Sequence, residues 1–332
     1  MTRKLTIKDI AQLAQTSKTT VSFYLNGKFE KMSSETRERI EAVIKETNYR
    51  PSALARSLNS KKTGLIGVLV GEIEHPITSQ VIAGIEQEAR KQGYQVLLGK
   101  SQFQVGEEEK ILDSMLLQGV EGFIIQPSTT LRKYSNLLQQ TGGLVFFDSQ
   151  IFEHRSSWVK SDLYHAVYEA VSQMIDKGYE EFILISAETG RLSTRLEKVA
   201  GFVDAVTDRN KTFSEYILAD QVFSDEEVEA FLQEHLDQDK ETLIVVINIW
   251  ALPHVYHLMK KMEIAFPKTG LIGFENSEWT DFSTPSISTI VHDGIKLGES
   301  AAETLISQLR DQNQEPIHRV IECTTQWKES TK

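Results

Sequence analysis

The sequence predicts an α/β protein that begins with an all-α headpiece, and three features predict it. Residues 6–28, TIKDIAQLAQTSKTTVSFYLNGK, carry two short helical patterns on either side of a tight break. From Gly64 onward, short apolar runs alternate with amphipathic stretches, which is typical of parallel sheets covered by helices. Charge divides the chain at the same place. Residues 1–62 hold 13 Lys and Arg against 6 Asp and Glu, whereas the rest of the chain holds 23 against 41.

The basic headpiece is predicted to form three short helices. Thr6 and Asp9 have the spacing of a capping box, and the apolar residues that follow recur on one helical face. Ser17 is suited to cap a second helix, and Gly27 marks its end. A third helix is expected from about residue 34 to residue 47. Two short helices joined by a tight turn form a helix-turn-helix.

In a helix-turn-helix bound to DNA, the second helix lies in the major groove and its first residues face the base edges. Lys18 and Thr19 are therefore the predicted base-reading residues, and Thr20, Ser22 and Asn26 are predicted to bind phosphates. For the helices alone, a generic three-helix bundle is the alternative. The positive charge of the headpiece favours a polyanionic partner.

Residues 51–63 are predicted to form a hinge helix and a linker. Pro51 ends the preceding structure, and the segment after it has room for about two helical turns, which are marginal in water by themselves. Such a segment is expected to order only on DNA. Arg56 is suited to contact the DNA backbone, and the apolar Leu58 is suited to wedge between base steps in the minor groove.

These motifs resemble the lactose-repressor and purine-repressor (LacI/GalR) family of transcription regulators. The resemblance rests on residues 6–28, on SSETRERIEAVIKETNYRPSALARSL and on TGLIGVLV, and it extends over the whole chain. It implies a helix-turn-helix domain at 1–50, a hinge at 51–63 and an effector-binding and dimerisation core at 64–332. It also implies a homodimer, or a tetramer made of two dimers, on a near-palindromic operator.

Residue by residue, the resemblance assigns base reading to Lys18 and Thr19 and the minor-groove wedge to Leu58. One position departs from the family, which usually has Arg after the TVS triplet, where this chain has Phe23. Phenylalanine has no hydrogen-bond donor, so it offers only apolar contact, for example with a thymine methyl group. We therefore expect the operator to differ at that base pair.

The acidic part of the chain is predicted to contain eight strands, separated by helices such as those at 77–92, 106–118, 163–177 and 192–209. The strand-like runs are GLIGVLV, YQVLL, GFIIQ, GLVFF, FILIS, EYILA, LIVVIN and GLIGF. Because this span is about twice that of one sheet, two lobes are expected. The family resemblance implies a periplasmic-binding-protein-like core of two doubly wound parallel-sheet lobes. The N-lobe is placed at about 64–162 and 292–322, and the C-lobe at about 163–291 and 323–332.

Ligands of parallel sheets bind beyond the carboxyl ends of the strands, and this rule selects candidate effector-binding residues. Each of them, taken alone, is more often structural, but the resemblance places them all in the family's effector pocket. The candidates at strand ends are His75, Ile77, Thr78, Asp148, Asn248, Trp250 and Glu275.

The segment AETGRLSTRLEKVAGF, residues 187–202, resembles the family's effector-binding segment. It adds Arg191, Thr194 and Arg195 to the candidates, and the family's usual Arg falls on Lys198. Lysine carries a mobile point charge, whereas arginine can form two parallel hydrogen bonds to one ligand group. Two further departures are Glu275 in place of the usual Asp, and Ile77 in place of the Phe of the family's NPF motif, which removes an aromatic wall.

Other motifs predict no catalytic residue, no cofactor and no metal. GYQVLLGKS has five residues between its glycines, where a phosphate-binding loop has four, and YQVLL is a strand. His254 and His257 lie one helical turn apart without a third ligand nearby in sequence, so a packed or solvated pair is expected. The chain also lacks the G-x-S-x-G and G-x-G-x-x-G fingerprints.

The single cysteine, Cys323, suits a reducing compartment, and neither a secretory signal nor a membrane-spanning run is recognisable. We therefore expect a cytoplasmic, ligand-responsive repressor of carbohydrate catabolism genes. The alternatives are a solute-binding-protein-like sugar sensor and a cytosolic α/β enzyme. The basic headpiece discriminates against both, because neither needs a helix-turn-helix.

Effector identity rests on Lys198, Glu275 and the segment GFENSEWTDFSTPSISTI. Together they resemble regulators of ketodeoxygluconate, hexuronate and glycosaminoglycan breakdown in Gram-positive bacteria, so a carboxylated sugar is favoured. A neutral sugar or a sugar phosphate stays open. The sequence also leaves open whether the ligand releases or promotes DNA binding, which operator is bound, and whether the assembly is a dimer or a tetramer.

Overall fold

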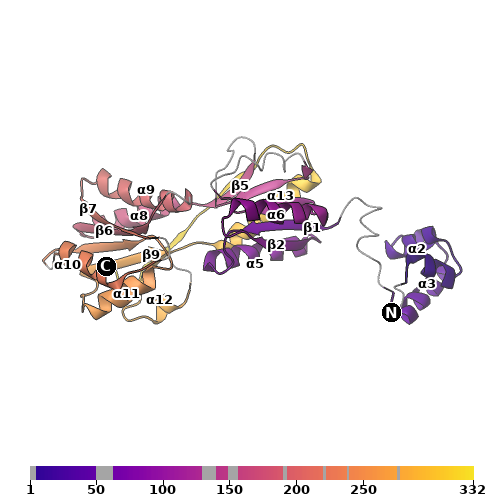
Figure 1. Ribbon diagram of the computed structural model, residues 1–332, viewed down its shortest axis with the longest axis horizontal. Helices are drawn as coiled ribbons and strands as arrows, with labels where there is room; N and C mark the ends of the chain where they lie inside the picture. The colour runs from indigo at the N-terminus through magenta and orange to yellow at the C-terminus, as the bar shows by residue number, and fades with distance from the viewer. Residues whose placement is uncertain are drawn as a thin grey trace. The chain divides into compact units, whose positions relative to one another are not determined.

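The computed structural model describes residues 5–49, 63–128, 140–148, 156–189, 193–219, 222–237, 239–274 and 277–332. The chain divides into two units, Met1–Thr63 and Gly64–Lys332. Figure 1 shows the helices of the first unit, which are α1 (Ile7–Leu13), α2 (Lys18–Leu25), a short 3₁₀ helix (Phe29–Lys31) and α3 (Ser34–Thr47).

Local capping explains where the three headpiece helices begin. Thr6 and Asp9 form the predicted capping box, in which the Thr6 N–H donates to Asp9 Oδ2 over 2.7 Å. Ser17 Oγ accepts a hydrogen bond from the Thr20 N–H at the start of α2, and Ser33 does the same for α3. The break before α2 uses the left-handed conformation of Gln15, with φ of 50°. The fully buried side chains Ile10, Val21 and Ile40 then hold the three helices together. The predicted helix-turn-helix is confirmed.

The second unit contains two six-stranded sheets. The first sheet has the spatial order β11 (His318–Ile321), β5 (Ser157–Ser161), β4 (Leu144–Phe147), β3 (Gly122–Ile125), β1 (Leu65–Val70), β2 (Gln95–Lys100). The second has the order β12 (Thr324–Gln326), β10 (Ser288–Val291), β9 (Thr269–Phe274), β8 (Thr242–Val246), β6 (Glu181–Ala187), β7 (Phe213–Leu218). All described strand pairs are parallel except β10 with β12.

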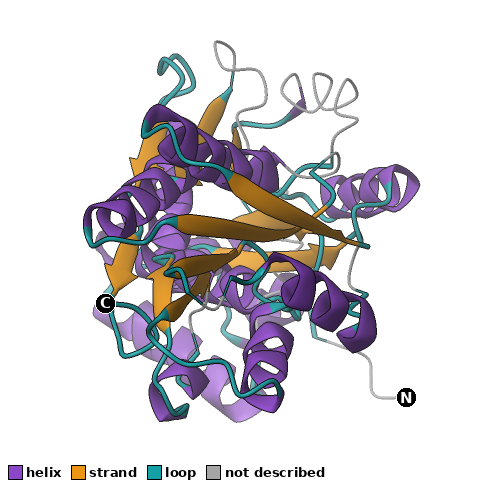
Figure 2. Cartoon of the chain, turned by 90° about the vertical axis from the view of Figure 1, so that its left-hand side faces the viewer, coloured by secondary structure: helices purple, strands orange, loops and turns teal. Residues whose placement is uncertain are grey.

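Helices cover both faces of the sheets (Figure 2), as expected for doubly wound parallel sheets. They are α5 (Pro76–Lys91), α6 (Val105–Leu117), α8 (Leu163–Asp176), α9 (Ser193–Asp208), α10 (Asp225–His235), α11 (Leu252–Lys261), α12 (Trp279–Phe282) and α13 (Gly294–Arg310). The predicted fold class is therefore confirmed. Among the described residues, we find no helix that is both long and apolar enough to cross a membrane.

Two helix pairs pack closely because glycine removes a side chain at the crossing. A Cβ atom on Gly298 of α13 would lie 2.1 Å from the carbonyl oxygen of Val81 in α5. A Cβ atom on Gly201 of α9 would lie 2.3 Å from the carbonyl oxygen of Tyr164 in α8. The backbone of α9 is thus held directly against α8, which fixes the helix that carries Lys198.

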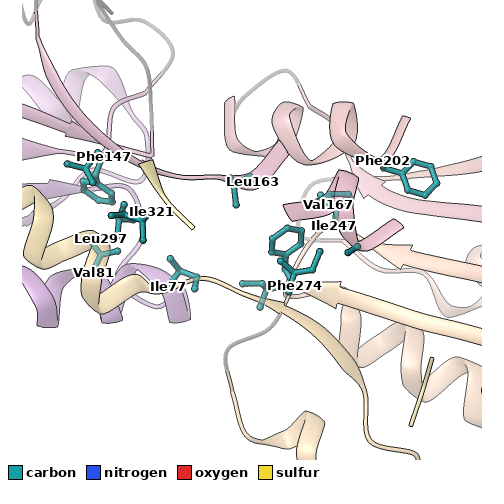
Figure 3. Close-up of a cluster of buried hydrophobic side chains, with 14 of the residues drawn as sticks. Ile77, Val81, Phe147, Leu163, Val167, Phe202, Ile247, Phe274, Leu297 and Ile321 are labelled. Atoms are coloured by element: carbon teal, nitrogen blue, oxygen red, sulfur yellow. The ribbon is translucent and has the colours of Figure 1, made fainter. Parts of the chain in front are cut away.

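The chain passes between the two sheets three times. It leaves the first sheet after β5 and enters α8, whose N-cap Asp162 accepts a hydrogen bond from the His165 N–H. It returns after β10 into α13, which packs on β3, β4 and β5 of the first sheet. It crosses for the third time between β11 and β12. One cluster of buried hydrophobic side chains extends over both sheets (Figure 3), with Phe147 of β4 and Leu297 of α13 beside the first sheet and Phe202 of α9 and Phe274 of β9 beside the second.

Four strands extend the eight that the apolar runs predicted. These strands, β5, β10, β11 and β12, are three to five residues long; β12 is wholly polar and the other three mix apolar with polar residues. All four lie at or next to the edge of a sheet, with β11 and β12 at the edges themselves. A short edge strand buries little apolar surface, so hydrophobic pattern alone does not reveal it.

Candidate functional site

A cavity of ≈ 540 Å³ lies at the carboxyl ends of strands from both sheets of the second unit. Residues that follow strands of the first sheet line one wall: Glu72, His75, Ile77, Thr78, Gln102, Phe103, Gln104, Gln126, Ser128 and Asp148. Helix α9, the loop after β8 and the residue that follows β10 supply the rest: Thr194, Arg195, Lys198, Ile247, Asn248, Ile249, Trp250 and His292. This volume lies in the range of small-molecule sites.

Nine of the predicted effector-binding residues line this cavity. They are His75, Ile77, Thr78, Asp148, Thr194, Arg195, Lys198, Asn248 and Trp250. Arg191 and Glu275 lie outside the described residues. The strand-end rule and the position of α9 thus select side chains that the fold brings together, and their role in binding stays a proposal.

Lys198 is the distinctive group of the cavity. Its ammonium nitrogen lies 3.7 Å from the centroid of the Phe274 ring, a cation–π contact. Within the described part of the chain, no oxygen atom accepts a hydrogen bond from it. Burial lowers the pKa of Lys198 to about 8, against the opposing effects of Cys323 and Asp148. The side chain therefore keeps hydrogen-bond donors for a ligand.

Asp148 supplies a carboxylate from the other wall. It follows β4 in the left-handed conformation, with φ of 51°, and its N–H donates to the carbonyl oxygen of Val159 over 3.0 Å. Burial raises the pKa of Asp148 to about 6, and the nearby positive charge of Lys198 opposes that rise. At neutral pH the carboxylate is mainly ionised and is suited to accept hydrogen bonds from hydroxyl groups.

The neighbours of Lys198 add little competing charge. The pKa of His292 is lowered well below its ordinary value, first by burial and then by Lys198 and His75, so the ring is neutral at neutral pH. Burial raises the pKa of the Cys323 thiol to about 12. The Arg195 guanidinium donates to the backbone carbonyl of Glu188, which ties it to the end of β6. Lys198 thus faces the cavity as a cation with two neutral neighbours, His292 and Cys323, while the Asp148 carboxylate lies on the other wall.

Backbone groups fix two amide side chains of the cavity. Asn248 Oδ1 accepts a hydrogen bond from the Ala187 N–H over 2.8 Å, and Gln126 Oε1 accepts one from the Gly71 N–H over 3.2 Å. Because a backbone N–H can donate only to the oxygen of a side-chain amide, these contacts set the orientation of both amides. Each amide therefore keeps its NH₂ group, a donor, for other partners.

Several cavity residues escaped the sequence analysis, and most of them also follow strands. Gln102, Phe103 and Gln104 follow β2, Gln126 and Ser128 follow β3, and His292 follows β10. Applying the strand-end rule to β2 and β3 would have found the first five, whereas β10 was not predicted as a strand.

Phe103 supplies an aromatic side chain that the sequence analysis did not identify. Ile77 in place of Phe was expected to remove an aromatic wall, but the Phe103 ring lines the same cavity. It packs against Gly71, where a Cβ atom would lie 2.1 Å from Phe103 Cζ. The left-handed conformation of Phe103, with φ of 55°, accompanies this placement. An aromatic surface for a ligand is therefore present, from a different loop.

The predicted DNA-binding residues gather on α2. Lys18 and Thr19 are exposed at its first two positions. The Thr20 hydroxyl lies 2.8 Å from Ser17 Oγ, and Asn26 Nδ2 donates to the carbonyl oxygen of Ser22 over 2.8 Å. Phe23 is partly buried. Arg56 and Leu58 lie outside the described residues.

The histidine pair that sequence analysis set aside lies on α11. The His254 ring stacks on Phe223 with centroids 5.0 Å apart. In the described ranges, no three His, Cys, Asp or Glu side chains are grouped closely enough to hold a metal ion.

Comparison with known proteins finds similarity to two family models and to bacterial transcriptional regulators. Residues 6–52 match the model of bacterial regulatory proteins of the lacI family, and residues 171–331 match that of the periplasmic binding protein-like domain. The chain is 27% identical to the HTH-type transcriptional regulator KdgR of Bacillus subtilis, over 92% of this chain and 91% of that protein. It is 28% identical to the probable HTH-type transcriptional regulator EndR of Paenibacillus polymyxa, over 95% and 94%.

A solved structure supports the same fold. The lac repressor dimer bound to operator and the anti-inducer ONPF matches with a TM-score of 0.87 and 20% identity, over 99% of each chain.

Proposed function

We propose that this chain, whose residues 6–52 match the lacI family of bacterial regulatory proteins, is a member of that family and represses carbohydrate catabolism genes under the control of a small effector. The observation that carries the proposal is the combination of exposed Lys18 and Thr19 on a helix-turn-helix with a ligand-sized cavity in the core. KdgR and EndR, to which the chain is similar, are named as transcriptional regulators, so we propose no catalysis.

The distribution of charge along the chain suits a headpiece that binds DNA and a core that binds an effector. The basic headpiece is attracted to phosphate, and counterion release makes that attraction dependent on salt. The acidic core is repelled by the duplex. An effector changes DNA affinity only by as much as its affinities for two states of the protein differ. We propose that closure of the two lobes around the cavity is the change that the hinge at 51–63 transmits to the headpiece.

The assembly and the domain limits are proposals of the same kind. A homodimer is supported by the fold likeness to the lac repressor dimer, and a tetramer stays possible. The sheet membership of β5, β10, β11 and β12 supports lobes at about 64–162 with 292–322, and at about 163–291 with 323–332. Binding to chromosomal DNA implies action in the cytoplasm.

The favoured effector is a sugar acid, because Lys198 offers a cation without a hydrogen-bonded counterion among the described residues. A carboxylate beside Lys198 would satisfy its donors, while Asp148 would accept from hydroxyl groups of the sugar. Phe103 and Trp250 offer apolar surface for the ring or chain of a sugar. A neutral sugar or a sugar phosphate is the alternative effector.

Two experiments test the function. Selection of duplexes from a random DNA pool by the full-length protein should enrich a near-palindromic site. Calorimetry with D-glucuronate, D-galacturonate and D-gluconate, each against its neutral counterpart, should detect the sugar acid but not the neutral sugar. Enrichment of no common site would contradict the regulator, and equal binding of acids and neutral sugars would contradict the effector class.

Affinity for a sugar acid should depend on pH in one direction. Because the pKa of Lys198 is lowered to about 8, the ammonium is present at neutral pH and lost as the pH rises through that value. Affinity should therefore fall above the pKa, approaching a factor of about ten per pH unit for a contact that needs the proton. Calorimetry across this range measures the fall, and binding of a neutral sugar should stay flat. An affinity that rises with pH would rule out Lys198 as the anion site.

Replacing Phe23 with arginine should change the bases that α2 prefers. Arginine can donate two hydrogen bonds to guanine, which phenylalanine cannot, and a good bidentate contact is worth about 1–3 kcal/mol. We expect the consensus selected from random DNA to gain a guanine at one position in each half-site. Leu13→Arg is the matched control, because Leu13 is 55% exposed on α1 and the substitution adds the same charge outside α2. The same consensus for Phe23→Arg and the parent would refute the assignment.

A further inference from the structure

We propose that Glu108, which lies outside the cavity, is a positioning residue that makes Ser128 accept, and not donate, a hydrogen bond from an effector hydroxyl. This inference deepens the proposed function, on which it rests. It adds a rule of specificity: a hydroxyl of the effector, and not its carboxylate, meets the wall that Ser128 forms.

The two residues form a buried, doubly bonded pair. Glu108 belongs to α6 and is only 1% exposed, and Ser128 follows β3 and is 5% exposed. Glu108 Oε1 accepts a hydrogen bond from the Ser128 N–H over 3.2 Å, and Glu108 Oε2 accepts one from the Ser128 hydroxyl over 2.8 Å. Ser128 lines the cavity and Glu108 does not. One carboxylate thus fixes both the backbone and the side chain of a wall residue.

The chemistry of the pair sets what Ser128 can offer. An ionised carboxylate only accepts hydrogen bonds, and a serine hydroxyl has a single proton. The positive end of α6 favours a negative charge on Glu108, which lies near the start of that helix. With its proton committed to Glu108, Ser128 Oγ has only lone pairs left for a ligand.

The other polar groups of the cavity divide into hydrogen-bond donors and acceptors, and this division decides where each group of an effector can bind. Gln126 and Asn248 keep their NH₂ donors, because backbone N–H groups hold their oxygen atoms. Lys198 is a donor as well. The wall of the first sheet supplies acceptors, among them Asp148, Ser128 and the carboxylate of Glu72. An anionic group would meet lone pairs at Ser128, which is unfavourable, so the carboxylate of an effector belongs beside Lys198 and a hydroxyl belongs beside Ser128.

Glu108→Gln should reverse the polarity of Ser128. The glutamine oxygen can still accept from the Ser128 N–H, but its NH₂ group then faces Ser128 Oγ and must donate to it. The hydroxyl proton of Ser128 is released and becomes available to the cavity. If Glu108 only supported the fold, Glu108→Gln would lower the affinity for all ligands alike. On our proposal, it instead makes Ser128 prefer a ligand acceptor where the parent prefers a ligand donor.

The experiment uses the full-length protein and whichever of D-glucuronate or D-gluconate binds more tightly in calorimetry. Each hydroxyl of that probe is replaced in turn by hydrogen, which removes donor and acceptor, or by fluorine, which removes the donor and keeps a weak acceptor. In the parent protein, one position should lose about tenfold in affinity with either replacement, the size of a typical hydrogen bond. In Glu108→Gln, the fluorine analogue should regain most of that loss while the hydrogen analogue should not.

Two variants separate this effect from damage to the fold. Glu107→Gln removes a carboxylate from the same turn of α6, and the Glu107 side chain contacts Lys110 at 2.6 Å, so its profile should match that of the parent. Added to Glu108→Gln, Ser128→Ala should remove the difference between the hydrogen and fluorine analogues that Glu108→Gln alone shows at that position. Identical profiles for Glu108→Gln and Glu107→Gln would overturn the inference and leave the sugar-acid effector intact.

A measurement on the protein without ligand tests the hydrogen bond between Ser128 and Glu108 even if Glu108→Gln does not fold or no sugar acid binds. A serine hydroxyl proton held by a buried carboxylate exchanges slowly with water, so proton NMR of the parent protein should show a Ser128 hydroxyl resonance that Ser128→Ala lacks. Absence of that resonance would refute the pairing of Ser128 with Glu108. Failure of all three sugar acids to bind would instead refute the proposed effector class.

Discussion

Replacing Phe202 with alanine is expected to lower the free energy of unfolding of the core by about 3–5 kcal/mol, the usual cost of truncating a fully buried phenylalanine. Phe202 is 0% exposed and lies on α9, where its ring meets the Phe213 ring edge to face at 5.3 Å. Figure 3 shows it within the cluster of buried side chains. At the neighbouring Gly201, the backbones of α9 and α8 are already in contact. The two helices therefore cannot move closer together to fill the cavity that the truncation leaves.

Urea unfolding followed by tryptophan fluorescence measures this loss selectively. All four tryptophans lie within residues 64–332, so their signal reports the core and not the headpiece. Leu196→Ala is the matched control, because Leu196 lies on the same helix but is 57% exposed. The control should shift the free energy of unfolding by less than about 0.5 kcal/mol. A small loss for Phe202→Ala would mean that α9 is not packed as described.

Prediction from sequence succeeded where a local rule determines structure. The three headpiece helices begin at Thr6, Ser17 and Ser33, and each start depends on a side chain that caps its own helix. Long apolar runs such as that of β1 are buried almost throughout, so hydrophobic pattern reveals them. By contrast, β12 consists of Thr-Thr-Gln and is held by pairing with β10, which no local pattern shows.

The residues of the candidate site likewise divide into those that a local rule or the family resemblance predicted and those that depend on distant contacts. Asp148 and Lys198 were predicted because each occupies a position that strand order or the family resemblance marks. Glu108 was missed because it lies on α6 and acts through a residue twenty positions away along the chain. The role of Phe103 depends on its contact with Gly71, which only the folded chain reveals. Contacts between distant segments are the part of a site that a single sequence does not show.

Lys198→Met should weaken binding of a sugar acid by about 1.5–3 kcal/mol, the range for hydrogen bonds to a charged group. In dissociation constant this is roughly ten- to a hundredfold. Methionine keeps much of the apolar stem but removes the ammonium that lies over the Phe274 ring. The loss should therefore appear for the acid and be nearly absent for the corresponding neutral sugar. Calorimetry with D-glucuronate and D-glucose, or whichever pair the screen identifies, measures the difference.

The controls for this change address fold and DNA binding separately. Lys296→Met removes an exposed ammonium from the start of α13, outside the cavity, and should leave the affinity for the acid unchanged. Affinity of Lys198→Met for operator DNA without ligand should equal that of the parent, because the headpiece is untouched. The dependence of acid binding on pH should also disappear, since the group that titrates near 8 is gone. Equal losses for acid and neutral sugar would show that Lys198 shapes the cavity and does not read the charge of the effector, and the sugar-acid assignment would lose its physical basis.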